Sequence, residues 1–226
     1  MLMSTVIKKH LEQITEKVTP ANQDIITCFE NISPLFVKAG VFDPSRGRSA
    51  KKFAAAITLL PPKKGDDILE IGVGSGALSL HANKRQIVRS TTGVDLDIKA
   101  IQSAKKNFET HNTNASLYIS DMFNDVSGKF DYIMFNAPTA HPEIQSDNPA
   151  NVTVWDPSLS LKKRFVEGLK SHLNLDNPDA MALMTYTIYS DYDGMKEIDF
   201  SDFNIQRILV DKDDLSEVGI LVITPK

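Results

Sequence analysis

The feature that most constrains this chain lies in residues 66–80, where an apolar strand pattern runs directly into alternate glycines. Ile68, Leu69 and Ile71 form the kind of apolar run that fits a buried parallel strand. Residues 77–83 then read as the first turns of a helix. The glycines let the backbone turn sharply and approach a ligand without interference from a Cβ atom. They are Gly72, Gly74 and Gly76.

The glycine spacing alone leaves its purpose open. Residues 72–77, which end at Ala77, satisfy the G-x-G-x-x-G/A pattern of dinucleotide-binding proteins. It also fits a tight strand-to-helix turn that binds no ligand. The rest of the chain is needed to separate these interpretations.

Composition and charge narrow the class of protein. With 226 residues, of which 42% are hydrophobic, the chain can bury a sizeable core as one large domain. A net charge of −4 argues against an extended nucleic-acid-binding surface. The five histidines lack ligand spacing and Cys28 is the single cysteine, expected to be buried, so we predict no metal site. No apolar run suits a membrane span or a signal peptide, so we expect a cytoplasmic protein without a membrane partner.

The first 40 residues show helical spacing of their apolar positions. One segment covers residues 6–18, and Asn22 can cap a second helix that carries residues 25–32. We therefore expect residues 1–40 to form a helical lead-in and residues 41–226 to form the main domain. The lead-in either packs on that domain or covers its ligand site.

After the glycine turn, strand and helix patterns alternate, which indicates an α/β fold with a mainly parallel, doubly wound sheet. The last two strands are joined by a short polar turn at 211–216, which permits only an antiparallel pair. Helices are expected at 51–60, 77–83, 98–108 and 159–173. Seven strands are expected, at 68–71, 92–96, 117–119, 130–135, 180–188, 203–210 and 218–223.

Polar residues stand at or near the ends of the first four of these strands, where ligands bind in such sheets. Asp95 follows Gly76 by 19 residues, a position from which a carboxylate can accept ribose hydroxyls. Asp121 could accept a hydrogen from an adenine amino group. The four end residues are Glu70, Asp95, Asp121 and Asn136.

With these residues in place, the chain resembles the class I S-adenosylmethionine-dependent methyltransferases. Residues 70–76 resemble the glycine motif of that family, 93–95 its ribose-binding motif and 120–123 its adenine-binding motif. Residues 135–139, Phe-Asn-Ala-Pro-Thr, resemble the N-P-P-Y/F motif of the nitrogen-methylating branch. That branch includes release-factor glutamine methyltransferases and amino-methyltransferases of RNA and DNA. The resemblance implies a Rossmann-like, seven-stranded sheet with an antiparallel C-terminal strand.

The resemblance also implies roles for individual residues. The side-chain oxygen of Asn136 and the carbonyl of Ala137 would accept the N–H groups of a methyl acceptor, and Pro138 would stiffen the loop. The acceptor would be a protein, an RNA or a small molecule with an amide or amine nitrogen. The S-adenosylmethionine cofactor would be bound by Glu70, Gly72, Gly74, Gly76, Asp95 and Asp121.

Two departures from the motif keep alternatives open. Ala137 replaces the first proline, and Thr139 replaces the aromatic residue that would stack on a planar acceptor. His141 is either a base near the site or an ordinary loop histidine. The alternatives to a methyltransferase are an NAD-dependent oxidoreductase with the same glycine turn and a cofactor-binding relative without catalytic activity.

Overall fold

The computed structural model describes residues 5–7, 9, 12–13, 21–138, 156, 159–190 and 192–226. Within them, no helix combines the length and the apolar character that crossing a membrane demands. The helices are α2 (Arg48–Leu59), α3 (Ala77–Arg85), α4 (Ile98–Thr110), α5 (Ser160–His172) and the short 3-10 helix η2 (Gly194–Glu197). The strands are β1 (Ile25–Phe29), β2 (Ile32–Val37), β3 (Asp67–Ile71), β4 (Ser90–Asp95), β5 (Ser116–Ile119), β6 (Tyr132–Phe135), β7 (Met181–Tyr189), β8 (Phe203–Lys212) and β9 (Ser216–Pro225).

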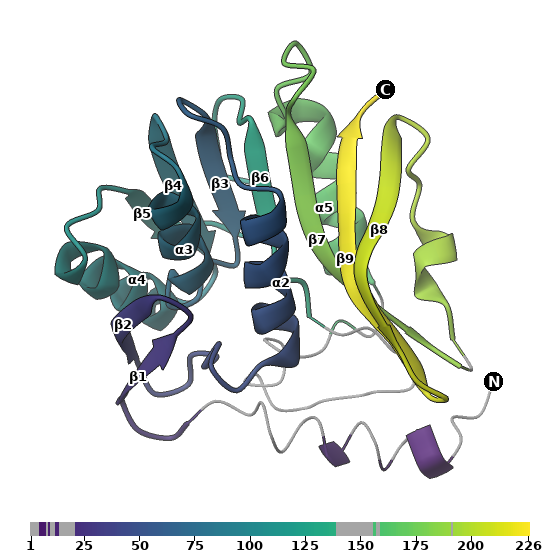
Figure 1. The fold of residues 1–226 in the computed structure, drawn as a ribbon, viewed down its shortest axis with the longest axis horizontal. Coiled ribbons are helices and arrows are strands. Elements are labelled where there is room, and N and C mark those ends of the chain that lie inside the picture. Colours follow the sequence, from purple (N-terminus) through teal and green to yellow (C-terminus); the bar gives the residue numbers. More distant parts are fainter. Residues whose placement is uncertain are drawn as a thin grey trace.

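Strands β3 to β9 form one seven-stranded sheet in the order β5-β4-β3-β6-β7-β9-β8 (Figure 1). The five strands from β5 to β7 are mutually parallel, and β9 runs antiparallel to both β7 and β8. The chain therefore has the predicted α/β, Rossmann-like fold, with a mainly parallel sheet and an antiparallel C-terminal strand. All seven expected strands are present, and no end is shifted by more than two residues.

Helices cover both faces of the sheet (Figure 1). One buried cluster joins residues of α2, α3 and α4 to sheet residues such as Ile68 and Tyr132. A second cluster joins α5 to the residues that alternate with them on the strands, such as Leu69 and Ile133. Successive side chains of a strand point to opposite faces, so both faces of β3 and β6 are buried, as their apolar residues predicted.

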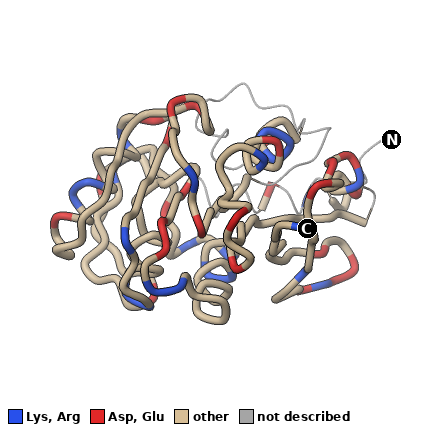
Figure 2. The backbone as a smooth tube through the Cα atoms, turned by 90° about the horizontal axis from the view of Figure 1, so that it is seen from above, with Lys and Arg blue, Asp and Glu red and all other residues tan. Residues whose placement is uncertain are grey.

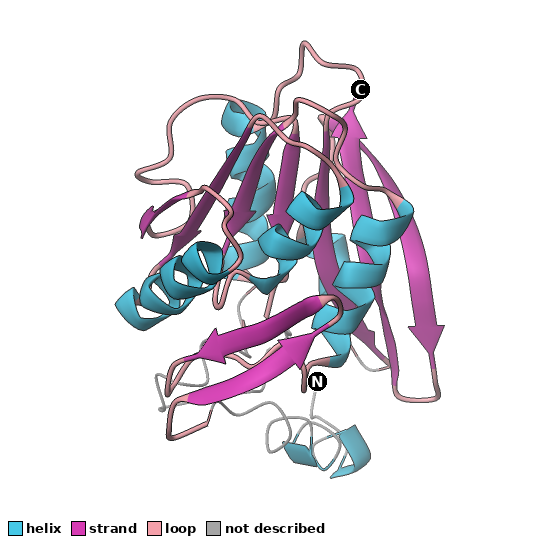
Figure 3. Ribbon diagram, turned by 60° about the vertical axis from the view of Figure 1, so that its left-hand side comes forward, coloured by secondary structure: helices cyan, strands magenta, loops and turns pink. Residues whose placement is uncertain are grey.

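The prediction of a helix over residues 25–32 was wrong. β1 and β2 form an antiparallel hairpin with a turn at Glu30 and Asn31, where Glu30 has a φ of 51°. The hairpin lies outside the large sheet (Figure 3). Its β-branched residues favour strands, and Phe29 joins the core beside α2 to α4. Strand alternation also turns Cys28 outward, so this cysteine is exposed rather than buried.

Strand register brings the carboxyl ends of the central strands level with one another. Ile71 pairs with Val94 on one side and with Phe135 on the other, and Phe135 pairs with Met184. The next residue along each strand therefore lies at one common edge of the sheet. These residues are Gly72, Asp95, Asn136 and Thr185.

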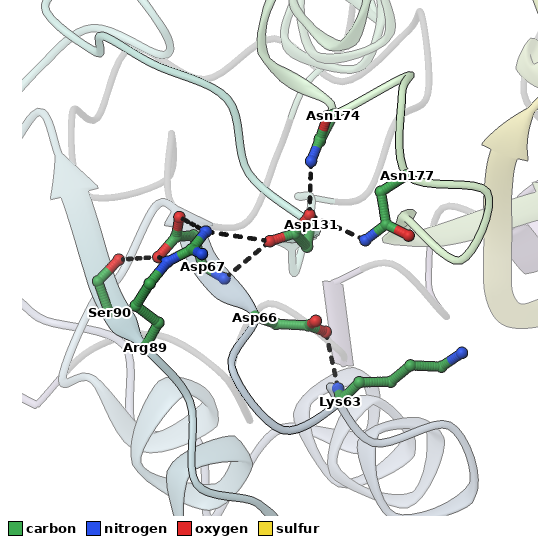
Figure 4. A network of polar contacts seen from close by, with 8 residues as sticks. All are labelled: Lys63, Asp66, Asp67, Arg89, Ser90, Asp131, Asn174 and Asn177. Atoms are coloured by element: carbon green, nitrogen blue, oxygen red, sulfur yellow. Dashed lines mark hydrogen bonds and ion pairs between the residues drawn. The ribbon is translucent and has the colours of Figure 1, made fainter.

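The opposite edge of the sheet is closed by a polar network (Figure 4). One oxygen of Asp131 accepts hydrogen bonds from Asn174 at 2.8 Å and Asn177 at 2.9 Å. Its other oxygen accepts the backbone N–H of Asp67 at 3.1 Å and lies 3.7 Å from Arg89. This network ties the start of β3 to the turn that leads into β7.

Candidate active site

A pocket of about 810 Å³ opens at the carboxyl edge of the sheet. Its walls come from the loop before α2, the glycine turn and the ends of β4, β5 and β6. Eight of the nine residues predicted for the site line it. They are Glu70, Gly72, Gly74, Asp95, Asp121, Asn136, Ala137 and Pro138.

The glycine turn has the backbone geometry that only glycine adopts at low cost. Gly72 and Gly74 have φ values of 67° and 53°, in the left-handed region. The nearest atom to a Cβ built on Gly74 would be the Gly72 carbonyl oxygen, 4.0 Å away. A side chain at Gly74 would therefore project into the pocket rather than into packed protein, as expected for a close approach of backbone to ligand.

Gly76 differs from the other two glycines because it is not among the residues that line the pocket. It is the N-cap of α3, with a φ of 78°. A Cβ at this position would lie 2.9 Å from the ring of Phe108 and 3.3 Å from Ala104. Gly76 therefore lets α3 approach α4 closely.

Glu70 is a buried carboxyl group beneath the glycine turn, 2% exposed. One of its oxygens, Oε2, accepts the backbone N–H of Ser79 at 3.0 Å and also the Ser79 hydroxyl. It therefore satisfies an N–H group in the first turn of α3. Burial raises the pKa of Glu70 to about 8, so this carboxyl is mostly protonated at neutral pH when the pocket holds no cation.

Asp95 links the end of β4 to the glycine turn. Its Oδ2 accepts the backbone N–H of Gly74 at 2.9 Å, and its Oδ1 accepts that of Asp97 at 3.0 Å. Burial raises the pKa of Asp95 above its usual value. Asp97 caps α4 by accepting the backbone N–H of Lys99 at 2.8 Å, which confirms the predicted cap.

Asp121 follows β5 at the rim of the pocket. Its carboxylate forms an ion pair of 2.9 Å with Arg164 of α5, and both side chains are partly exposed. Arg164 also donates to the backbone carbonyl of Asp121 at 3.3 Å. Basic and acidic positions are interspersed along the described chain (Figure 2). The pair fixes Asp121 at the rim while leaving lone pairs on its carboxylate for a ligand.

Residues 136–138, which we call the Asn-Ala-Pro turn, bring two oxygen acceptors together. The hydroxyl oxygen of Thr185 lies 3.2 Å from Asn136 Oδ1 and 3.1 Å from the carbonyl oxygen of Ala137. Both acceptors therefore converge on one point beside the pocket. The Ala137 N–H donates to the carbonyl of Phe135 at 2.9 Å, which closes the turn tightly.

The backbone carbonyl of Pro138, the last residue of this turn, accepts a hydrogen bond from a buried lysine. Lys162 is 1% exposed, and its ammonium group donates to the carbonyl of Pro138. Burial lowers the pKa of Lys162 to about 8, against the opposing influence of the nearby Asp156 carboxylate.

Sequence reasoning missed both Thr185 and Lys162. Thr185 is one of several polar residues in β7, and only the register with β6 shows that it meets Asn136. Lys162 stands between Leu161 and Lys163 in a helix rich in basic residues, where a lysine is ordinarily solvated. The one sign of its burial in the sequence is that Lys162 falls on the apolar stripe of α5.

Two expectations of the sequence analysis concern residues outside the described part of the chain, namely Thr139 and His141. Within the described residues, no group of three His, Cys, Asp or Glu side chains is placed to hold a metal ion.

The arrangement suits transfer of a group between two bound molecules. A glycine cradle and carboxyl groups form one wall of the pocket, and paired oxygen acceptors stand at the end of β6. Such acceptors can orient the N–H groups of a nitrogen nucleophile and stabilise positive charge that develops on it.

Comparison with known proteins agrees with this geometry. A family model described as the methyltransferase small domain matches residues 35–155. Among curated relatives, a candidate protein N5-glutamine methyltransferase of Methanocaldococcus jannaschii is 44% identical over 75 residues, 33% of this chain and 38% of that protein. The release factor glutamine methyltransferase of Streptococcus pneumoniae is 35% identical over 94 residues, 42% of this chain and 34% of that protein. The chain therefore spans little more than a third of the length of these relatives.

Solved structures share the fold. The 16S rRNA N2 G1207 methyltransferase of Thermus thermophilus, determined with AdoMet and guanosine, superposes with a TM-score of 0.61 at 15% identity. The match covers 97% of this chain and 62% of that one. At this level of identity the likeness concerns the fold.

Proposed function

The chain belongs to the family of the methyltransferase small domain, and from this premise we propose that it is an S-adenosylmethionine-dependent N-methyltransferase. The observation that carries the proposal is the convergence of Asn136 Oδ1 and the Ala137 carbonyl beside a pocket lined by the glycine turn. Paired acceptors of this kind suit a substrate nitrogen that carries hydrogen atoms.

The residues of the pocket fit this cofactor. The open space beside Gly74 admits a ligand against the backbone. Asp95 keeps lone pairs for ribose hydroxyls, and Asp121 keeps lone pairs for an adenine amino group. The carboxyl group of Glu70 can become an anion that faces a cationic ligand. Bound S-adenosylmethionine supplies an electrophilic methyl group on a sulfonium.

The chain's own residues then orient the acceptor. An amide or aromatic amine is a poor nucleophile because its lone pair is delocalised. Asn136 and Ala137 would accept its two N–H hydrogens, direct its lone pair toward the pocket and stabilise the positive charge that grows on the nitrogen. Pro138 would limit the motion of this turn.

The proposed methyl acceptor is inferred from the names of related proteins. One relative is named for N5 of glutamine and one fold neighbour for N2 of a guanosine, so both names specify a nitrogen atom. We propose an amide or amine nitrogen of a protein, an RNA or a small molecule. We also propose the cytoplasm as its compartment, which suits the exposed thiol of Cys28. The division at residue 41 between a lead-in and a methyltransferase domain stays a prediction.

Two measurements test the proposal. Thermal unfolding with S-adenosylmethionine, S-adenosylhomocysteine or NAD should show stabilisation by the first two alone. Stabilisation by NAD alone would favour the oxidoreductase alternative. Label from methyl-tritiated S-adenosylmethionine should then reach the nitrogen of a glutamine-containing peptide, a guanosine-containing oligoribonucleotide or a small amine from cell extract. Cofactor binding without transfer to any extract fraction would favour a non-catalytic relative.

A further inference from the structure

One oxygen atom from each of the three residues of the Asn-Ala-Pro turn is held by a side chain from another element. The Thr185 hydroxyl of β7 lies within hydrogen-bond distance of Asn136 Oδ1 and of the Ala137 carbonyl. The Lys162 ammonium group of α5 donates to the carbonyl of Pro138. Both side chains are buried, at 3% and 1% exposure. Neither belongs to the glycine turn or to the carboxylate positions of the pocket.

The Thr185 hydroxyl has one proton to share between two acceptors. Each acceptor oxygen has two lone pairs, so the contact with Thr185 leaves one on each for a substrate N–H. The two oxygens stay directed toward the same side because both must reach the same hydroxyl. Thr185 thus fixes the relative placement of Asn136 and Ala137 before any acceptor arrives.

Lys162 binds the last residue of the Asn-Ala-Pro turn, Pro138. Burial of an ammonium group is costly unless it is hydrogen-bonded, and the Pro138 carbonyl supplies that bond. Asp156, itself buried, accepts the backbone N–H groups of Leu161 at 3.1 Å and Lys162 at 3.2 Å. The first turn of α5 is therefore anchored, and Lys162 is presented to the Asn-Ala-Pro turn from a fixed support.

We propose that Thr185 and Lys162 are positioning residues that hold the Asn-Ala-Pro turn in the geometry needed to receive the methyl acceptor. The inference rests on the proposed function for its purpose, although the two contacts are independent of the cofactor. A turn in which Ala137 replaces a proline has a freer backbone at that position, and the two donors compensate for that freedom.

A matched pair of variants tests Thr185. Thr185→Val keeps the shape but removes the hydroxyl, whereas Thr185→Ser keeps the hydroxyl. In the 15N NMR spectrum of the free protein, the side-chain amide of Asn136, assigned by its loss in Asn136→Ala, should shift and broaden in Thr185→Val. Thr185→Ser should restore it. An unchanged Asn136 signal in Thr185→Val, or equal perturbation by both variants, would overturn the inference.

Lys162 is tested against its neighbour. Lys162→Met should speed hydrogen exchange of the Ala137 amide by about tenfold or more, because the turn loses a charge-assisted hydrogen bond. Lys163→Met removes an exposed lysine that pairs with Glu197 and should leave that exchange unchanged. Equal exchange in Lys162→Met and the wild type would count against Lys162. Should Thr185→Val fail to fold, this comparison decides the question.

Turnover separates this inference from the proposed function. With an acceptor in hand, Thr185→Val should lower kcat by about 10²-fold, the scale of a small misplacement of reacting groups. Calorimetric affinity for S-adenosylmethionine should stay unchanged. Full turnover in Thr185→Val would sink the inference and leave the function standing. If the wild-type protein did not bind the cofactor, the proposed function would be refuted. The NMR and hydrogen-exchange results would still show whether Thr185 and Lys162 hold the Asn-Ala-Pro turn.

Discussion

The carboxylate of Asp95 accepts the backbone N–H of Gly74 at 2.9 Å, so the end of β4 holds the middle of the glycine turn. The residue predicted to bind the cofactor ribose therefore also shapes the turn that we propose as the cofactor cradle. Its other oxygen accepts the N–H of Asp97, so backbone donors hold both oxygens of this carboxylate.

Replacing Asp95 should therefore affect binding more than folding. We expect Asp95→Ala to weaken S-adenosylmethionine binding by about 1.5–3 kcal/mol, the range for hydrogen bonds to charged groups. Asp97→Ala should instead lower the free energy of unfolding by about 1 kcal/mol, because α4 loses its cap. Calorimetry and urea unfolding measure the two effects. If Asp97→Ala weakened cofactor binding and Asp95→Ala lowered only the free energy of unfolding, Asp97 would be the residue that binds the ribose.

The glycine turn predicts a loss of binding that spares the fold. Gly74→Val should abolish S-adenosylmethionine binding, since its side chain would enter the pocket. Gly65→Val is a matched control, because Gly65 also has a positive φ of 87° but nothing lies within 4 Å of a Cβ there. Both variants should lose about 1–2 kcal/mol of stability from the left-handed backbone. Cofactor affinity retained in a folded Gly74→Val protein would refute the cradle.

The raised pKa of Glu70 predicts proton release on cofactor binding. Burial raises this pKa to about 8, so most Glu70 is protonated at pH 7 in the free protein. A cationic ligand favours the ionised form and lowers the pKa, so binding should release up to about one proton. Affinity should rise as the pH approaches about 8 and level off above it.

Calorimetry in buffers of different ionisation enthalpy measures this release. Glu70→Gln cannot release the proton and serves as the control for ionisation of the ligand itself. Its hydrogen bonds with Ser79 can persist because an amide oxygen accepts as a carboxyl oxygen does. Identical proton release by the wild type and Glu70→Gln would show that Glu70 is not the group that responds to the ligand.

Local chemistry made the centre of the fold predictable from the sequence. An apolar run before alternate glycines requires a strand and a turn, and Asp97 before a helical pattern is a cap. The segment of residues 25–37 was missed because its apolar spacing suits a helix as well as a hairpin. Packing of Phe29 and Ile32 into the core beside α4 decides between them.

The candidate site was predictable only where it depends on one strand end at a time. Asp95 and Asn136 each follow an apolar run, so their common edge could be inferred from a parallel sheet. The partnership of Thr185 with Asn136 depends on the register between β6 and β7, which no local pattern specifies. The packing role of Gly76 could not be predicted, because spacing alone does not reveal the ring of Phe108 behind it.

The network at the opposite edge of the sheet should govern stability in acid. Burial alone would raise the pKa of Asp131, but hydrogen bonds from Asn177, the Asp67 N–H and Asn174 outweigh it and hold the pKa below 3.8. The folded state therefore prefers the ionised form. Its contribution to stability is present above pH 3.8 and is lost as the pH falls through the lower folded pKa.

Urea unfolding of Asp131→Ala at several pH values tests this expectation. At pH 7 the variant should lose about 1–3 kcal/mol, the cost of leaving buried donors without a partner. The difference from the wild type should shrink below pH 3.8. Asp179→Ala, which removes an exposed pair with Lys63, should cost no more than about 1 kcal/mol. A constant difference across the acid range would show that the Asp131 charge is unimportant.

Asn136 carries the prediction that bears most directly on the chemistry. Its amide oxygen would accept from a nitrogen that becomes more positive during methyl transfer, so the contact is stronger in the transition state than in the ground state. Asn136→Ala should lower kcat by about 10²–10³-fold, the scale for one preorganised polar group. Affinity for S-adenosylmethionine should be nearly intact. The exposed Asn204, which bonds the carbonyl of Pro225, offers a control in Asn204→Ala, with unchanged kcat.

The charge on residue 136 then separates two ways in which this contact can act. Asn136→Asp should be milder than Asn136→Ala if the acceptor nitrogen gains full positive charge, because a carboxylate stabilises that charge. It should be equally harmful if the amide acts only by orienting the acceptor. Full turnover of Asn136→Ala on the true acceptor would remove the main support for nitrogen methylation, and an oxygen or carbon acceptor would then be the better assignment.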